Sequence, residues 1–180
     1  MNENKVTKCS PPYPKGCSPD YIEPKDYKPY RFALGKNGTN PFVAICMNPS
    51  AAKEESSDRT INKIIKLGQT FKMDGWIVFN TYPERATNAR NMDKYNRSLS
   101  ENNISVIRDY LIDNHIKEVW GAWGNDNGID ALVKGKKDLL KMLNEIGVKV
   151  YYFGTLTKDG NPRHPLQRQE KTDYSVKKYL

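Results

Sequence analysis

Polar side chains that can recognise a nucleobase or hold a water molecule follow several apolar runs of the chain. Asn48 and Asn80 each come directly after such a run, Asn125 follows a third, and His164 lies in the loop after a fourth. An asparagine amide offers both a hydrogen-bond donor and an acceptor, and a histidine can donate to a carbonyl or to a developing oxyanion. We therefore hypothesise a polar site built from these four residues.

Asn48 stands at the end of the most apolar run, residues 42–47, and is followed by Pro49. Pro49 has no N–H for a sheet ladder, and it restricts Asn48 to extended backbone geometry. The Asn48 amide suits either the edge of a base or the positioning of a water, and a side chain that caps its own turn is the structural alternative. For Ser50, a phosphate contact and a local cap fit the sequence equally well.

Further candidates lie in the loops next to these strand ends. Asn80 can form two hydrogen bonds with the edge of a purine or pyrimidine, or can be satisfied by local backbone. In the loop after it, Tyr82 can stack on a base or pack on the sheet, and Arg85 can hold a phosphate. Gly124 permits close approach of the backbone to a ligand or to another element. Asp58 is interpreted as a helix N-cap, ahead of its alternative role as a catalytic carboxylate.

The apolar periodicity predicts the elements that position these residues. Strands are expected over residues 30–34, 42–47, 76–79, 118–123 and 148–153, and helices over about 58–72, 100–112 and 128–146. Alternating strands and helices indicate an α/β fold with a mainly parallel sheet and helices on both faces. Ligands of such folds bind outside the carboxyl ends of the strands, so the loops that carry the polar residues are expected to meet at one edge.

Length and charge bound the organisation and the partners. The 180 residues suffice for one domain, expected over residues 30–180, behind an extended, proline-rich leader over residues 1–29 that is laid over the domain. The charged tail, residues 169–180, is expected to form a last short helix. The formal net charge of +8 favours a polyanionic partner, nucleic acid or a nucleotide, and a charge that only keeps the protein soluble is the alternative. The oligomeric state does not follow from the sequence.

Cysteines and histidines argue against several kinds of site. The three cysteines and two histidines are too scattered along the chain to form a zinc site; they are Cys9, Cys17, Cys46, His115 and His164. Three cysteines are also fewer than the four thiolates that an iron–sulfur cluster usually needs, so we predict no metal and no cofactor. Cys9 and Cys17 could pair, whereas Cys46 is typical of a small buried hydrophobe. An odd number of cysteines and no signal peptide favour a cytoplasmic setting, and no apolar run approaches the roughly 20 residues of a membrane span.

Five motifs of the chain resemble one protein family. They are FVAICMNPSAA, the SDRT that opens the first long helix, VFNTYPERAT, EVWGAWG and LTKDGNPRHPL. In this order, and over about residues 30–168, they resemble the bacterial and phage family called domain of unknown function 1643. That family name implies no activity.

The same segments more remotely resemble the uracil-DNA glycosylase superfamily. The counterparts of its strand-end motifs would be Met47-Asn48-Pro49-Ser50, Phe79-Asn80, Ala122-Trp123-Gly124 and His164-Pro165-Leu166. The resemblance implies a three-layer α/β/α sandwich with a central, mainly parallel four-stranded sheet and a nucleobase pocket at its carboxyl edge. It also implies that Asn48 positions water, that Asn80 reads the base and that His164 hydrogen-bonds the base carbonyl.

Two departures from that superfamily bear on the chemistry. Asn48 is neutral and cannot act as a general base, whereas the most active members carry Asp at this position. The segment from His164 to Gln167 lacks the usual serine, which helps to grip phosphate, and Leu166 is a candidate for the apolar wedge that enters DNA. The fold can therefore be kept while the substrate or the chemistry has changed.

The leading hypothesis is an enzyme that hydrolyses the N-glycosidic bond of a base in DNA or in a nucleotide, after flipping the base out where the DNA is double-stranded. Asn48 and His164 would be catalytic, and the residues expected to bind substrate are Met47, Pro49, Ser50, Asn80, Tyr82, Arg85, Gly124, Asn125 and Arg163. The alternatives are a non-catalytic nucleotide-binding protein and a DNA-binding accessory protein that uses the basic leader and tail.

Overall fold

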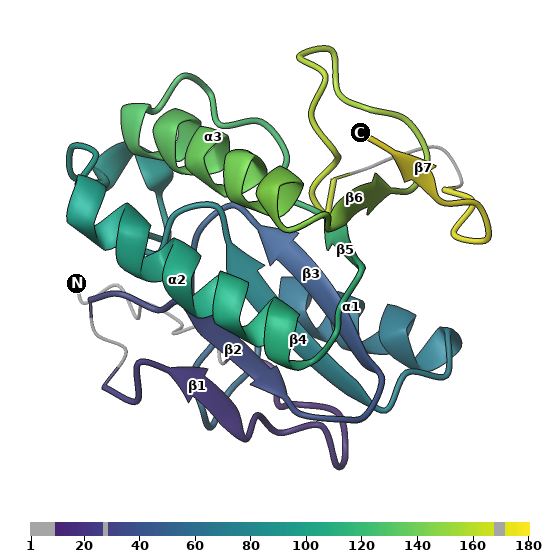
Figure 1. The fold of residues 1–180 in the computed structure, drawn as a ribbon. Coiled ribbons are helices and arrows are strands. Elements are labelled where there is room, and N and C mark those ends of the chain that lie inside the picture. The colour runs from purple at the N-terminus through teal and green to yellow at the C-terminus, as the bar shows by residue number, and fades with distance from the viewer. Residues whose placement is uncertain (1–9, 27–28, 168–171) are drawn as a thin grey trace, which may run out of the picture.

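The computed structural model describes residues 10–26, 29–167 and 172–180 of the protein (Figure 1). These residues form an α/β fold with one β-sheet, which contains both parallel and antiparallel strands, and three α-helices. The strands are β1 (Tyr21–Glu23), β2 (Ala33–Lys36), β3 (Pro41–Cys46), β4 (Gly75–Asn80), β5 (Glu118–Gly121), β6 (Lys149–Tyr152) and β7 (Lys178–Tyr179). The helices are α1 (Arg59–Thr70), α2 (Arg97–Asp113), α3 (Asp130–Glu145) and a short 3-10 helix, η1 (Ala89–Asn91).

The centre of the sheet is parallel, as the alternation of elements predicts. The strand order is β1-β2-β4-β3-β5-β6-β7, in which β4, β3, β5 and β6 run in one direction. β1 and β2 are antiparallel on one side of this centre, and β7 is antiparallel on the other. The expected four-stranded sheet thus has seven strands among the described residues, because short flanking segments pair with edges that would otherwise expose unpaired backbone groups.

Helices cover both faces of the sheet (Figure 1). On one face α1 packs through Ile61 and Ile64 against the side chains that β3, β4 and β5 direct to that side. On the other face α2 and α3 pack through Ile107, Leu111 and Leu139. All six residues of β3 are buried because this strand lies between the two helical layers.

Local capping sets the boundaries that differ from the sequence-based ones. α2 begins at Arg97, one turn before Ser100, because the side chain of Asn96 accepts the N–H of Leu99 at 3.0 Å. Ser100 lies inside the helix, and its hydroxyl donates to Asp138 of α3 at 3.1 Å. α3 ends as predicted before Gly147, which adopts a φ of +69°.

The described part of the leader, residues 10–26, packs on the domain and contributes a strand to the sheet. Tyr13 stacks on Trp76 with 5.8 Å between ring centroids, and the indole N–H of Trp76 donates to the Cys17 carbonyl at 3.0 Å. β1 pairs with β2 from Tyr21 to Glu23. Cys9, for which a disulfide with Cys17 was considered, lies outside the described residues.

The expected short helix in the tail is wrong for residues 172–180, where Lys178 and Tyr179 form β7 instead. The edge of β6 is open to pairing, and Tyr179 adds a ring contact with Tyr151 and a hydroxyl donated to Glu118 at 2.9 Å. Residues 169–171 lie outside the described residues. None of the helices in the described part of the chain combines the length and apolar character needed to cross a bilayer.

Hydrogen bonds at the carboxyl ends of the parallel strands hold the first loop residues in place. The backbone N–H of Thr81 donates to Cys46 at 2.9 Å, and the Thr81 hydroxyl donates to Met47 at 2.7 Å. The N–H of Ala122 donates to Ile45 at 2.8 Å. The ends of β3, β4 and β5 therefore form one continuous edge.

Candidate functional site

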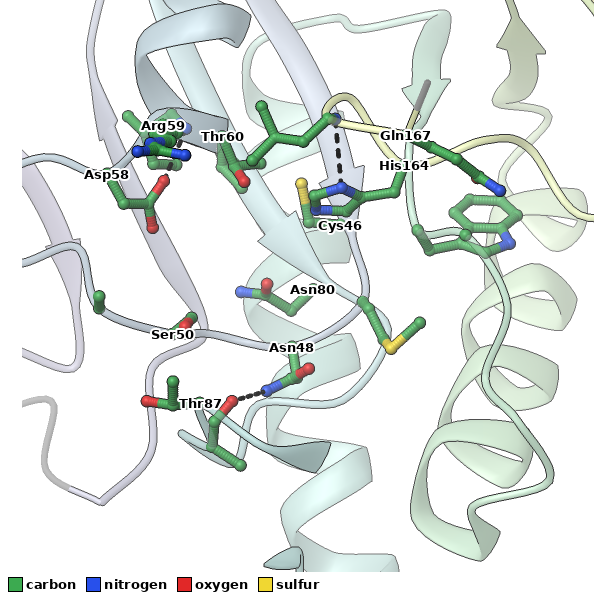
Figure 2. A pocket seen from close by; sticks show the side chains of 18 of the residues that line it. Cys46, Asn48, Ser50, Asp58, Arg59, Thr60, Asn80, Thr87, His164 and Gln167 are labelled. Atoms are coloured by element: carbon green, nitrogen blue, oxygen red, sulfur yellow. Dashed lines mark hydrogen bonds between the residues drawn. The ribbon is translucent and has the colours of Figure 1, made fainter. Parts of the chain in front are cut away.

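A cavity of about 780 Å³ opens at this edge (Figure 2). Its walls come from the end of β3, the first turn of α1, the end of β4, the loops that follow β4 and β5, and residues 164–167. The volume falls in the range of small-molecule sites, which is roughly 300–1,000 Å³. Most of the predicted site residues line it, namely Met47, Asn48, Ser50, Asn80, Gly124, Asn125 and His164.

The remaining predicted residues lie outside the lining of this cavity. Tyr82 is 1% exposed, packs against α2 and α3, and its hydroxyl accepts the N–H of Asn96 at 2.9 Å. Pro49 is buried, and Arg85 donates to the Ser50 carbonyl at 2.9 Å. Arg163 points elsewhere and donates to the Thr155 carbonyl at 3.0 Å. These side chains support the walls of the cavity or neighbouring loops.

Asn48 uses one half of its amide to hold the wall together. Its Nδ2 donates to the carbonyls of Ala86, at 2.8 Å, and Pro49, at 3.0 Å. The N–H of Ala86 in turn donates to Pro49 at 3.1 Å, so the end of β3 is tied to the loop after β4. The Asn48 nitrogen therefore has the local structural role that was the alternative to a functional one. Its Oδ1 is an acceptor that a water in the cavity can use.

Asn80 presents a buried donor that has no partner. The residue is 1% exposed, and its Nδ2 has no hydrogen-bond partner among the described residues. Its backbone carbonyl accepts the Nδ2 of Asn103 at 3.0 Å, which fixes the end of β4 from the α2 side. A buried, unpaired amide is costly unless a ligand or water completes it. In Figure 2 this amide points into the same cavity as Asn48 and His164.

His164 is held as a neutral donor. Its Nδ1 accepts the N–H of Leu166 at 3.2 Å, so the Nε2 of the neutral imidazole carries the proton. Burial lowers the pKa of His164, the Asp58 carboxylate raises it and the Lys63 ammonium lowers it, and burial is the largest of these effects. The ring is therefore mainly neutral near pH 7 and can donate from Nε2.

The loop after β5 contacts the His164 segment and forms an amide network. Gly124 has a φ of +73°, and its N–H donates to the Pro162 carbonyl at 2.9 Å. Asn125 donates to Asp159 at 2.5 Å and accepts from the Asn161 amide at 3.3 Å. The amide of Asn125 therefore serves to join two loops at the rim of the cavity.

Asp58 is the N-cap of α1, as the sequence favours, because its Oδ1 accepts the N–H of Ile61 at 2.9 Å. It also lines the cavity, and among the described lining residues it is the one carboxylate.

Cys46 lines the cavity as well, and burial raises the pKa of its thiol to about 12. Cys46 is thus a neutral thiol, consistent with its predicted role as a small buried hydrophobe.

Arg31 is a lining residue that the sequence-based reasoning missed. It lies two residues before β2, which is antiparallel to β4, so the amino end of β2 comes to the edge where the parallel strands end. Arg31 is 2% exposed, its Nη1 donates to the Ala52 carbonyl at 2.5 Å, and its Nε has no partner among the described residues. An arginine just before an edge strand is a weak sequence signal, because strand direction decides at which edge it lies.

The site has the groups for hydrogen bonding to a polar ligand rather than for holding a metal. Within residues 10–26, 29–167 and 172–180, no three His, Cys, Asp or Glu side chains come together as metal ligands. The cavity instead combines the donors of Asn80 and His164 with the acceptor of Asn48 and the cation of Arg31.

A family model described as "Protein of unknown function (DUF1643)" matches residues 31–166. The chain belongs to the DUF1643 family. The DUF1643 match begins at Arg31 and includes Asn48, Asn80 and His164, and thus covers most of the cavity. No curated protein and no solved structure matches the chain.

Proposed function

We propose that the cavity binds a nucleobase and that the protein hydrolyses the N-glycosidic bond of that base, in the manner of a glycosylase. The observation that carries the proposal is the Asn80 amide, which is 1% exposed, has an Nδ2 without a partner in the described residues and lies in the same cavity as His164. A planar heterocycle with carbonyl or ring-nitrogen acceptors would complete this donor, and His164 Nε2 would supply a second.

Each residue then has a distinct role. Asn80 would donate to the edge of the base, and Asn48 Oδ1 would orient a water toward the sugar carbon that carries the base. The C–N bond would break with its electron pair leaving on the base, while water adds to the sugar carbon and its proton finally passes to the base. His164, neutral and donating from Nε2, would stabilise the negative charge that develops on the departing base.

The architecture supports this proposal by its consistency with the uracil-DNA glycosylase resemblance. Four parallel strands, β4, β3, β5 and β6, lie at the centre of the sheet with helices on both faces. The residues matched to the motifs of that superfamily, among them Asn48, Asn80 and His164, line one cavity at the carboxyl edge. The formal net charge of +8 adds a general attraction for phosphate-bearing substrates.

A binding protein without hydrolytic activity is the second candidate, and the position of Asp58 favours it. Asp58 is the one carboxylate among the described lining residues, and its Oδ1 is engaged by the first turn of α1. Asn48, which follows β3, is neutral and cannot remove a proton from water. In this reading, Asn80 and His164 recognise the base and the bond stays intact.

The two candidates are separated by the fate of the ligand. Purified protein is incubated with pooled DNAs and nucleotides, and released bases are measured by mass spectrometry beside native spectra of the protein. Wild type should release a free base, and Asn48→Ala and His164→Ala should each lose that release. His115→Asn and Asn144→Ala, at exposed positions, serve as matched controls and should retain it. An intact nucleotide bound to wild type, with no free base, would favour the binding protein; neither release nor binding would refute both.

A further inference from the structure

The Arg31 guanidinium is a buried positive charge in the wall of the cavity. Arg31 is 2% exposed, and none of the ion pairs among the described residues includes it. The Asp58 carboxylate on the cavity wall attracts the guanidinium, but burial and the positive charge of Arg85 have larger, opposite effects on the pKa of Arg31. A buried charge without a partner is strongly unfavourable, so such a group is expected where a ligand supplies the opposite charge.

Arg31 and Arg85 both hold the loop that forms one wall of the cavity. Arg31 Nη1 donates to the Ala52 carbonyl at 2.5 Å, and Arg85 Nη2 donates to the Ser50 carbonyl at 2.9 Å. Burial, and after it the positive charge of Arg85, lower the pKa of Arg31 to about 10. Two like charges therefore stand close to one short loop, and an anion bound there would relieve their repulsion.

The surroundings of Arg31 on the cavity wall can accommodate an anion. The hydroxyl-bearing residues Ser50, Thr60 and Thr87 line the same cavity, and Thr60 belongs to the first turn of the 12-residue helix α1, whose backbone N–H groups form the positive end of the helix dipole. Ser50 and Thr87 carry labelled hydroxyl side chains on one side of the cavity in Figure 2. The Nε of Arg31, which has no partner among the described residues, adds a donor suited to a phosphate oxygen.

We propose that Arg31 is the phosphate-binding residue of the cavity and that it takes the phosphomonoester of a free 5′-nucleotide whose base reaches Asn80. The binding of the base at Asn80 rests on the proposed function. The binding of the phosphate at Arg31 does not depend on it. Arg31 is 2% exposed, and a terminal phosphate can reach a charge at this depth as the end of a ligand. The phosphodiester of a DNA strand would have to bring both neighbouring nucleotides into a cavity of about 780 Å³.

The experiment measures binding by calorimetry with inorganic phosphate, with matched 2′-deoxynucleosides and their 5′-monophosphates, and with a short single-stranded oligonucleotide. Wild type should bind at least one monophosphate at least tenfold more tightly than its nucleoside and more tightly than the oligonucleotide per site. Arg31→Met, which keeps side-chain length and removes the charge, should abolish that preference, and Arg31→Lys should keep part of it. Arg97→Met, with a side chain that is 84% exposed, is the matched control and should bind like wild type.

The outcomes separate this inference from the proposed function. Nucleosides and monophosphates that bind wild type equally would overturn the Arg31 assignment and leave base recognition intact. Phosphate binding that depends on Arg31, with no nucleoside bound and no base released, would support the assignment and refute the nucleobase proposal. Preference for the oligonucleotide, lost in Arg31→Met, would overturn the free nucleotide as the ligand. If Arg31→Met fails to fold, the wild-type preference and Arg31→Lys still decide, because neither depends on that variant.

Discussion

The backbone of Gly124 lies directly against His164. A Cβ atom at position 124 would stand 3.2 Å from the His164 Cβ and 3.5 Å from its backbone nitrogen, and Gly124 has a φ of +73°. The loop after β5 and the loop after β6 are therefore held together by an approach that glycine alone makes without strain. The position of the imidazole in the cavity depends on this contact.

Gly124→Ala should weaken nucleotide binding because the new methyl group displaces His164 by a few tenths of an ångström. An alanine in this left-handed backbone conformation should also lower the free energy of unfolding by about 1–2 kcal/mol. Gly147→Ala is the matched control, since Gly147 has a φ of +69° and a Cβ there would meet no atom within 4 Å. Urea unfolding should show a similar loss in both variants, while calorimetry should show weaker binding only for Gly124→Ala. Equal binding by the two would contradict a positioning role.

Asn80→Ala should separate binding from stability. The variant removes a buried donor that has no partner in the described residues, so the free energy of unfolding should fall by less than about 1 kcal/mol. Binding of the base should weaken by roughly tenfold or more, which corresponds to about 1.4 kcal/mol. Asn103→Ala is the contrasting variant, because it removes the hydrogen bond to the Asn80 carbonyl and should cost about 1–3 kcal/mol of stability. A large stability loss in Asn80→Ala would mean that the amide is structural.

The stability of the protein should decrease as the pH falls below about 6.5, the ordinary pKa of histidine. Burial lowers the pKa of His164 in the folded state, so between the two pKa values the unfolded chain binds a proton that the folded chain does not. The stabilising contribution of neutral His164 is therefore complete above the unfolded pKa and diminishes toward the lower, folded one. Urea unfolding between pH 5 and 8 should show this dependence, and His164→Gln should flatten it. An unchanged profile in that variant would assign the dependence to other groups.

Asn48→Asp should destabilise the protein at pH 7 by about 1–3 kcal/mol, because a carboxylate would face the carbonyls of Ala86 and Pro49 in place of a donor. Protonation of the new carboxyl restores a donor, so its pKa should be raised and part of the stability should return as the pH falls. Urea unfolding at pH 7 and pH 5 checks this. Asn48→Ala, which lacks a titrating group, should show no such recovery.

If base release is hydrolytic, the carboxylate of Asn48→Asp also supplies the missing general base, and faster base release per folded molecule is the expected result.

Periodicity and turn residues were sufficient to predict the central architecture. The apolar run before Asn48 is long and uninterrupted, because a strand covered on both faces needs apolar side chains on each, and this strand was found as β3. The capping role of Asp58 and the helix end at Gly147 followed from local chemistry and were confirmed. The edge strands β1 and β7 were missed, because pairing of two or three residues depends on a sheet edge that is distant in the sequence.

For the candidate site, the sequence by itself determined which polar residues follow the strands of a parallel sheet, and those strand ends must meet at one edge. Asn48, Asn80, Gly124 and His164 were found there for this reason. Only the tertiary structure decided which side chains line the cavity. In the folded chain, Tyr82 packs in the core and the Asn80 Nδ2 has no partner among the described residues. Antiparallel pairing of β2 with β4 places Arg31 at the edge where the parallel strands end. Side-chain direction and strand direction depend on contacts between distant segments, which local sequence patterns do not contain.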